Sequence, residues 1–139
     1  MPVPRVYRGM FKDEGGRPAV GNSAAMLGVR IGTDIKPDEN SNVHVDGGGM
    51  SVAPSMEMMP MHRIPKRLRS RVPAARGNNN YAVWRFGDGP FANGEFSHKL
   101  DLRVTSEKHG IVTPNKTMSL PEYEEALIET REQWINDED

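Results

Sequence analysis

Three consecutive glycines, Gly47 to Gly49, separate two short strand-like runs at residues 43–45 and 50–52. Glycine adopts positive φ values at little steric cost and lets another backbone or a ligand come close. The sequence leaves two interpretations open. The glycines form the turn of a hairpin between the two runs, or they open a surface for close approach immediately before Ser51. Both interpretations place a short strand on each side of the glycines.

Glycine and proline interrupt the rest of the chain as well. The 139 residues include 14 Gly and 11 Pro, which is more than a globular domain usually has and less than indicates disorder. We therefore expect one loop-rich domain over residues 1–139, built from short elements.

The chain has no cysteine. Disulfides and thiolate chemistry are thereby excluded, and an intracellular protein is expected. No apolar run reaches transmembrane length, and the first residues lack the apolar region of a signal peptide. We therefore expect a cytoplasmic protein without a membrane partner, which a signal-independent secretion system can deliver into a target cell.

Alternation of apolar and polar residues predicts strands at residues 3–11, 81–86, 100–104 and 111–112. In the first of these strands Val6, Arg8 and Met10 share one face. Pro114 ends the last strand, because proline lacks the N–H that a sheet needs.

Three other segments carry weaker patterns. Residues 22–29 are short and apolar and are expected to form a helix or a strand, whereas residues 34–42 are expected to form a loop. Pro60 and Pro65 limit any helix between residues 55 and 71 to about two turns.

A C-terminal helix is predicted from its capping residues. Ser119 precedes it and Glu122 follows three residues later, the spacing of a capping box, while Pro121 fits the first turn. The stripe expected to face the core consists of Tyr123, Ala126, Leu127, Thr130 and Trp134. Short strands with one or two helices indicate an α+β domain.

Charge is distributed unevenly, although the net charge is only −1. Residues 58–87 contain no acidic residue, and their cations are Arg63, Lys66, Arg67, Arg69, Arg71, Arg76 and Arg85. Residues 120–139 contain eight acidic residues and a single cation, Arg131. The basic segment 63–76 is either a solvated loop or an anion-binding rim for a phosphate-bearing ligand or a nucleic acid.

Four short motifs occur in an order that resembles a family of bacterial toxins. They are Tyr7-Arg8, Gly48-Gly49-Met50-Ser51-Val52, His109-Gly110-Ile111-Val112-Thr113-Pro114 and Arg131-Glu132-Gln133-Trp134. This order resembles small type VI secretion effector toxins with an ADP-ribosyltransferase-like, NAD-binding fold. The resemblance implies a split β-sheet core with a C-terminal helix and a toxin that transfers ADP-ribose or hydrolyses NAD. It also implies a cognate immunity protein and a macromolecular target.

The same resemblance assigns roles to individual residues. The residues expected to be catalytic are Arg8, Ser51 and His109, and those expected to bind the NAD cofactor are Tyr7, Arg8, Gly48, Gly49 and Ser51. Two of them have a second interpretation from the residues alone. Arg8 can be a strand arginine paired with a carboxylate, and His109 can be a partly buried histidine with a structural partner.

Two departures from the family pattern favour an alternative function. Met50 stands where the family has a threonine. No residue clearly matches the catalytic glutamate of the wider superfamily, for which Glu107 is the nearest candidate. The alternative is a catalytically inactive relative that binds phosphate or nucleic acid through residues 63–76. A relative that processes RNA phosphates in the same cleft is a third interpretation. The four histidines are scattered without paired spacing, and no metal site is expected.

Overall fold

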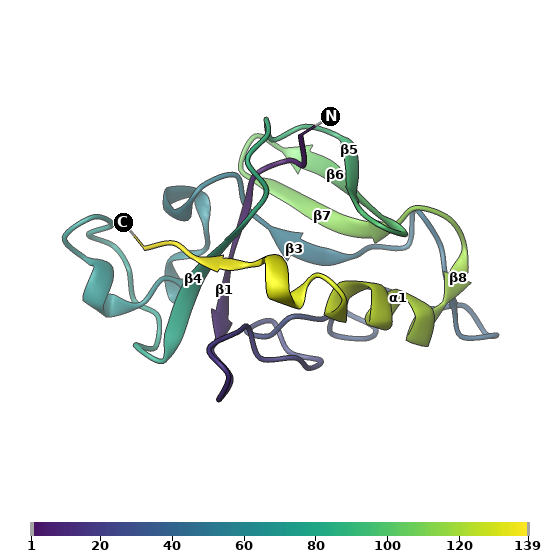
Figure 1. Cartoon of the computed structure of the whole chain (residues 1–139), viewed down its shortest axis with the longest axis horizontal. Coiled ribbons are helices and arrows are strands. Elements are labelled where there is room, and N and C mark those ends of the chain that lie inside the picture. Colours follow the sequence, from purple (N-terminus) through teal and green to yellow (C-terminus); the bar gives the residue numbers. More distant parts are fainter. Residues whose placement is uncertain (1, 139) are drawn as a thin grey trace.

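Short antiparallel strands form the framework of the molecule (Figure 1). The computed structural model describes residues 2–138. The strands are β1 (Val6–Phe11), β2 (Asn42–Val43), β3 (Met50–Val52), β4 (Tyr81–Phe86), β5 (Gly94–Ser97), β6 (Leu100–Ser106), β7 (His109–Pro114), β8 (Met118–Ser119) and β9 (Ile135–Asn136). The helices are α1 (Leu120–Ile128) and the short 3-10 helices η1 (Met56–Met58), η2 (Met61–Arg63), η3 (Lys66–Leu68) and η4 (Arg131–Gln133). The strands pair in the orders β1-β4-β9, β2-β8 and β3-β7-β6-β5, and the predicted α+β class is confirmed.

The four-stranded sheet β3-β7-β6-β5 packs against helix α1. In the β6–β7 hairpin Leu102 pairs with Val112, and both side chains are buried. Tyr123 of α1 reaches into this sheet. Its hydroxyl donates a hydrogen bond of 2.6 Å to the carbonyl of Val112 and accepts one of 3.2 Å from the backbone N–H of Met50. These bonds fix β3 beside β7 and hold the helix on the sheet.

Helix α1 has the predicted start. The hydroxyl of Ser119 accepts a hydrogen bond of 3.2 Å from the backbone N–H of Glu122, which satisfies a donor of the first turn. The helix ends at Ile128, and Trp134 follows after the 3-10 helix η4. Trp134 is fully buried, and its indole N–H lies 3.0 Å from the hydroxyl of Thr130. The prediction that Trp134 belongs to the core is confirmed, although it lies outside the helix.

The sheet β1-β4-β9 meets the four-stranded sheet at a seam formed by Tyr7 and Ala53. The backbone N–H of Tyr7 lies 2.7 Å from the carbonyl of Ala53, and the reverse hydrogen bond measures 3.0 Å. In Figure 1, β1 and β4 run across the direction of β3 and β7. Val6 and Met10 are fully buried and Arg8 is 7 % exposed, so the face of β1 that these three residues were predicted to share is a buried one.

The glycine run does not form a hairpin turn between its flanking strands, and that interpretation is wrong. β2 lies before the glycines and pairs with β8, whereas β3 follows them and pairs with β7. Gly48 has a φ of +108°, and a Cβ there would lie 2.2 Å from the carbonyl oxygen of Asp34. A Cβ on Gly49 would lie 2.2 Å from the carbonyl oxygen of Val112. The glycines thus admit other parts of the chain's own backbone.

Other segments differ from their predictions for local reasons. Residues 22–29 form no helix and no strand, because their backbone bonds to β1 and to residues 19–21. In place of a two-turn helix, residues 55–71 form η1, η2 and η3. Pro60 and Pro65 stand at the start of η2 and η3, where proline is tolerated. The strands β5, β8 and β9 were not predicted, since each is short and lacks a clear alternation.

Candidate functional site

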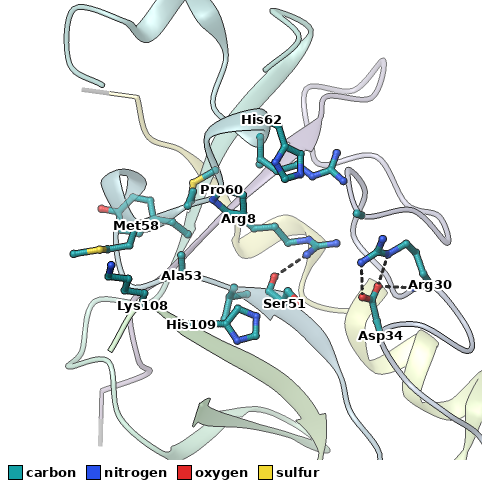
Figure 2. A pocket seen from close by; sticks show the side chains of 16 residues that line it. Arg8, Arg30, Asp34, Ser51, Ala53, Met58, Pro60, His62, Lys108 and His109 are labelled. Atoms are coloured by element: carbon teal, nitrogen blue, oxygen red, sulfur yellow. Dashed lines mark hydrogen bonds and ion pairs between the residues drawn. The ribbon is translucent and has the colours of Figure 1, made fainter. Parts of the chain in front are cut away.

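A cavity of about 440 Å³ opens at the seam between the two larger sheets. The predicted site residues that line it are Tyr7, Arg8, Ser51 and His109. Gly48 and Gly49 do not line it, and their Cβ positions face the chain's own backbone instead. Figure 2 shows Arg8, Ser51 and His109 around one space. Three motifs that are distant in the sequence therefore meet at one place, which we call the cleft.

Arg8 extends from β1 into the cleft and is bonded to the chain's own carbonyl groups. Its Nη1 donates a hydrogen bond of 2.7 Å to the carbonyl of Ser51, and its Nη2 donates one of 2.8 Å to the carbonyl of Met26. Its Nε donates to Met26 as well, and contacts of 3.4 Å reach the carbonyls of Ser23 and Gly28. Within residues 2–138 the partners of Arg8 are carbonyls, so the interpretation of a carboxylate pair is wrong.

Burial sets the electrostatics of Arg8. Desolvation lowers the pKa of its guanidinium to about 10, which still leaves the group charged at neutral pH. A guanidinium has five N–H donors, and Nη1 carries two of them. Among the described residues, Ser51 alone accepts a hydrogen bond from Nη1. The cleft thus presents a buried positive charge with one unused donor, which suits a phosphate oxygen.

Ser51 and His109 project from the same face of the four-stranded sheet. In the β3–β7 pair Ser51 lies opposite Ile111, and His109 stands two residues before Ile111 on β7. Side chains directly opposite each other share a face, and so do side chains two residues apart on one strand. A hydroxyl and an imidazole therefore lie on one face, next to the guanidinium of Arg8.

The imidazole of His109 is neutral at neutral pH. Partial burial lowers its pKa below the ordinary value of 6.5. Its Nδ1 lies 2.6 Å from the hydroxyl oxygen of Thr105, and that hydroxyl donates a hydrogen bond of 3.0 Å to the carbonyl of His109. Because the hydrogen of the Thr105 hydroxyl is used in the bond to the carbonyl, Nδ1 must donate its own hydrogen to the hydroxyl oxygen. Nε2 then keeps a lone pair. His109 can therefore accept a proton at Nε2.

Replacing His109 by alanine is expected to leave the stability nearly unchanged. Both His109 and its partner Thr105 are exposed, so water replaces the lost hydrogen bond. We expect the free energy of unfolding to change by no more than about 0.5 kcal/mol, measured by urea denaturation. A loss above about 1 kcal/mol, the cost of an unpaired buried partner, would instead support the interpretation of a structural histidine.

The structure adds residues that the sequence did not single out for the site. Arg30, Asp34, His62 and Lys108 line the cleft, and so does Arg63 of the basic segment. Arg30 and Asp34 form an ion pair with 2.9 Å between Nη2 and Oδ1. Desolvation lowers the pKa of His62 below 6.5, so this imidazole is neutral at neutral pH too. Arg30, Asp34 and Lys108 lie in loops and turns, and His62 and Arg63 lie in the three-residue 3-10 helix η2. In such short or irregular segments side chains follow no period that a sequence pattern can detect.

Four arginines of the basic segment 63–76 are bound to other groups of the chain, three of them outside the segment. The pairs are Arg63 with Tyr81, Arg67 with Glu138, Arg69 with the carbonyl of Ala75, and Arg71 with Glu57. Because Glu138 belongs to the acidic C-terminal region, the two charged regions partly neutralise each other. Of this segment, Arg63 is the residue that lines the cleft. These pairs reduce the support for nucleic-acid binding along the whole segment.

The described residues contain neither a group placed to hold a metal ion nor a helix able to span a membrane. Within residues 2–138, no group of three or more histidine, cysteine, aspartate or glutamate side chains is placed to hold a metal ion. In that same range no helix has the length and apolar character needed to cross a membrane.

Comparisons with protein-family models, with curated proteins and with solved structures find no match to this chain. The function must therefore be inferred from the cleft itself and from the order of the motifs that meet in it.

Proposed function

We propose that this chain is a bacterial toxin domain with an ADP-ribosyltransferase-like fold, which binds NAD in the cleft and hydrolyses it or transfers its ADP-ribose. One observation carries the proposal. Arg8, Ser51 and His109 come from three separate motifs and line a single cleft. Two antiparallel sheets that meet at the seam, with a helix near the C-terminus, support the split β-sheet core that the motif order implies.

The side chains of the cleft fit the diphosphate of NAD. Arg8 offers a buried positive charge and an unused N–H. Arg63 and Lys108 add cations to the walls. Charge-assisted hydrogen bonds of this kind bind phosphate groups strongly. The cavity of about 440 Å³ also lies within the range of cofactor and small-molecule sites.

In this proposal Ser51 and His109 orient the nicotinamide ribose beside the phosphates. When the bond between ribose and nicotinamide breaks, its electron pair leaves with nicotinamide and positive charge develops at the sugar carbon. Nε2 of His109 takes the proton from the water or acceptor group that attacks this carbon. A positive charge near that carbon would oppose the reaction, and a neutral imidazole adds none.

The carboxylates in and near the cleft are poorly suited to act as the general base, and this favours His109 in that role. Within residues 2–138 no glutamate lines the cavity, and Glu107 lies outside its wall although the next two residues belong to it. The carboxylate that does line it, Asp34, is held by Arg30. This lack of a glutamate supports a second candidate, a relative that binds NAD or another phosphate ligand without turning it over.

Expression in bacterial cytoplasm is expected to arrest growth, and Ser51→Ala is expected to relieve the arrest. The substitution removes the hydroxyl that holds the ribose and leaves the backbone of β3 unchanged. Ser97→Ala is the matched control, because Ser97 lies on β5 of the same sheet but outside the cleft. Growth curves with immunoblots of soluble protein provide the measurement, and calorimetry of the purified protein with NAD tests binding directly.

Each outcome decides between the candidates. Growth arrest that a cognate immunity protein reverses, together with NAD turnover, supports the toxin. Normal growth of cells that contain soluble wild-type protein excludes it. NAD binding without turnover selects the second candidate, and no binding at millimolar NAD rejects this ligand.

A further inference from the structure

Two histidines from separate segments line the cleft. His109 stands on β7 and His62 lies in η2. Figure 2 shows their rings on opposite sides of the Arg8 guanidinium. The proposed NAD reaction uses His109 as its base and gives His62 no role. Two imidazoles around a buried cation suit a reaction in which one proton is removed and another is supplied.

The fold holds both histidines close to Arg8. A Cβ on Gly9, the next residue of β1, would lie 2.6 Å from the carbonyl oxygen of the last residue of η2. The short helix that carries His62 therefore packs directly against β1. On the other side Nη1 of Arg8 donates a hydrogen bond of 2.7 Å to the carbonyl of Ser51. Ser51 shares a sheet face with His109, so the two imidazoles flank one guanidinium.

The two rings can take complementary roles in proton transfer. Nε2 of His109 keeps a lone pair, because Nδ1 is bonded to Thr105. The pKa of His62 is lowered by burial and by the charges of Arg63 and Arg76, and no side-chain hydrogen bond from residues 2–138 contributes to it. The negative charge of a bound phosphate acts in the opposite direction and favours the imidazolium. A phosphate in the cleft thus prepares His62 to donate a proton.

Arg8 supplies the charge that holds such a phosphate. Its guanidinium is buried, and among the described residues Ser51 alone accepts a hydrogen bond from Nη1. The remaining N–H suits a phosphate oxygen and stabilises the negative charge that the phosphate gains when a further oxygen attacks it. RNA places a hydroxyl group beside each phosphodiester, and this 2′-hydroxyl distinguishes it from DNA.

We propose that the cleft cleaves single-stranded RNA, with His109 as general base and His62 as general acid. Nε2 of His109 removes the proton of a ribose 2′-hydroxyl, and the 2′-oxygen forms a bond to the adjacent phosphorus. The bond between phosphorus and the 5′-oxygen breaks, and its electron pair goes to that oxygen. His62 gives this oxygen its proton. The products are a 2′,3′-cyclic phosphate and a 5′-hydroxyl.

The reaction shares the cleft with the proposed NAD reaction and does not depend on it. It needs no glutamate, because the two imidazoles move both protons. A single strand is required, because the attacking and leaving oxygens must lie in line with phosphorus, and a base-paired A-form helix holds them out of line.

A fluorescent single-stranded RNA oligonucleotide tests the inference, incubated with the full chain in EDTA and without NAD. The wild-type protein is expected to cut it, and mass spectrometry to show the cyclic phosphate and the 5′-hydroxyl. His62→Ala, His62→Gln and His109→Ala are each expected to lower the rate about 100-fold or more, the effect of a positioned acid or base. His98→Ala is the matched control and is expected to keep the wild-type rate, because His98 is exposed and lies outside the cleft.

The opposite results overturn the inference in distinguishable ways. RNA that stays intact with folded wild-type protein overturns it, and leaves the proposed function standing if the same protein turns over NAD. Cleavage at the wild-type rate by both His62 variants rejects the general acid. Cleavage of the same oligonucleotide with 2′-O-methyl riboses rejects attack by the 2′-oxygen. Melting curves establish that the histidine variants are folded, as expected for exposed side chains.

Discussion

Replacing Arg8 by alanine is expected to lower the free energy of unfolding by about 3–5 kcal/mol. The guanidinium is buried and donates to the carbonyls of Met26 and Ser51 at 2.8 and 2.7 Å. Each of these partly buried carbonyls that loses its donor costs up to about 1–3 kcal/mol, and the missing side chain leaves an empty space beside the seam. Urea denaturation followed by circular dichroism measures the loss.

Arg5→Ala is the matched control for this prediction. Arg5 is exposed, and its contact to the carbonyl of Asp88 is long at 3.4 Å, so we expect a change within about 0.5 kcal/mol. Equal stability of Arg8→Ala and wild type would show that water in the cleft satisfies the carbonyls. The structural role also affects binding assays, because an Arg8 variant that fails to bind a nucleotide must first be shown to be folded.

Gly49→Ala is expected to destabilise the protein by about 3 kcal/mol, at the upper end of the range for overpacking. The new Cβ would lie 2.2 Å from the carbonyl oxygen and 2.8 Å from the carbonyl carbon of Val112. Both atoms belong to the backbone of β7, which pairs with β3 and cannot move without breaking the sheet. Soluble yield and the midpoint of urea unfolding measure the effect.

A second glycine provides the comparison for Gly49. A Cβ on Gly94 would have nothing within 4 Å, and this glycine has no positive φ. Gly94→Ala is therefore expected to change the free energy of unfolding by no more than about 0.5 kcal/mol. Similar stability of the two alanine variants would contradict the close approach of β7 to Gly49.

Elements with a local signal could be predicted from the sequence, and their pairing could not. Alternation marked β1 and β4, and the Ser119 cap marked the start of α1, because these signals lie within a few residues of one another. The partners of β2 and β3 depend on contacts between distant segments. The glycines between those strands look the same in sequence whether they turn a hairpin or admit another backbone, so the hairpin interpretation failed.

Part of the candidate site could likewise be predicted from the sequence, and part could not. Motif order identified Arg8, Ser51 and His109, which lie on or next to regular strands. Lys108 and the Arg30–Asp34 pair come from loops and turns, and only the folded chain brings them to the same cavity. The carbonyl partners of Arg8 were equally hidden, since any residue type carries a backbone carbonyl.

The seam has a consequence for the cooperativity of unfolding. Two backbone hydrogen bonds between Tyr7 and Ala53 join the sheets there, and residues from both sheets line the cleft at this point. A ligand that touches both walls therefore acts as a crosslink between two halves of the molecule. Its binding free energy adds to the free energy needed to separate the two halves. The amide hydrogens of Tyr7 and Ala53 are therefore expected to exchange with solvent more slowly when ligand is bound than when the cleft is empty.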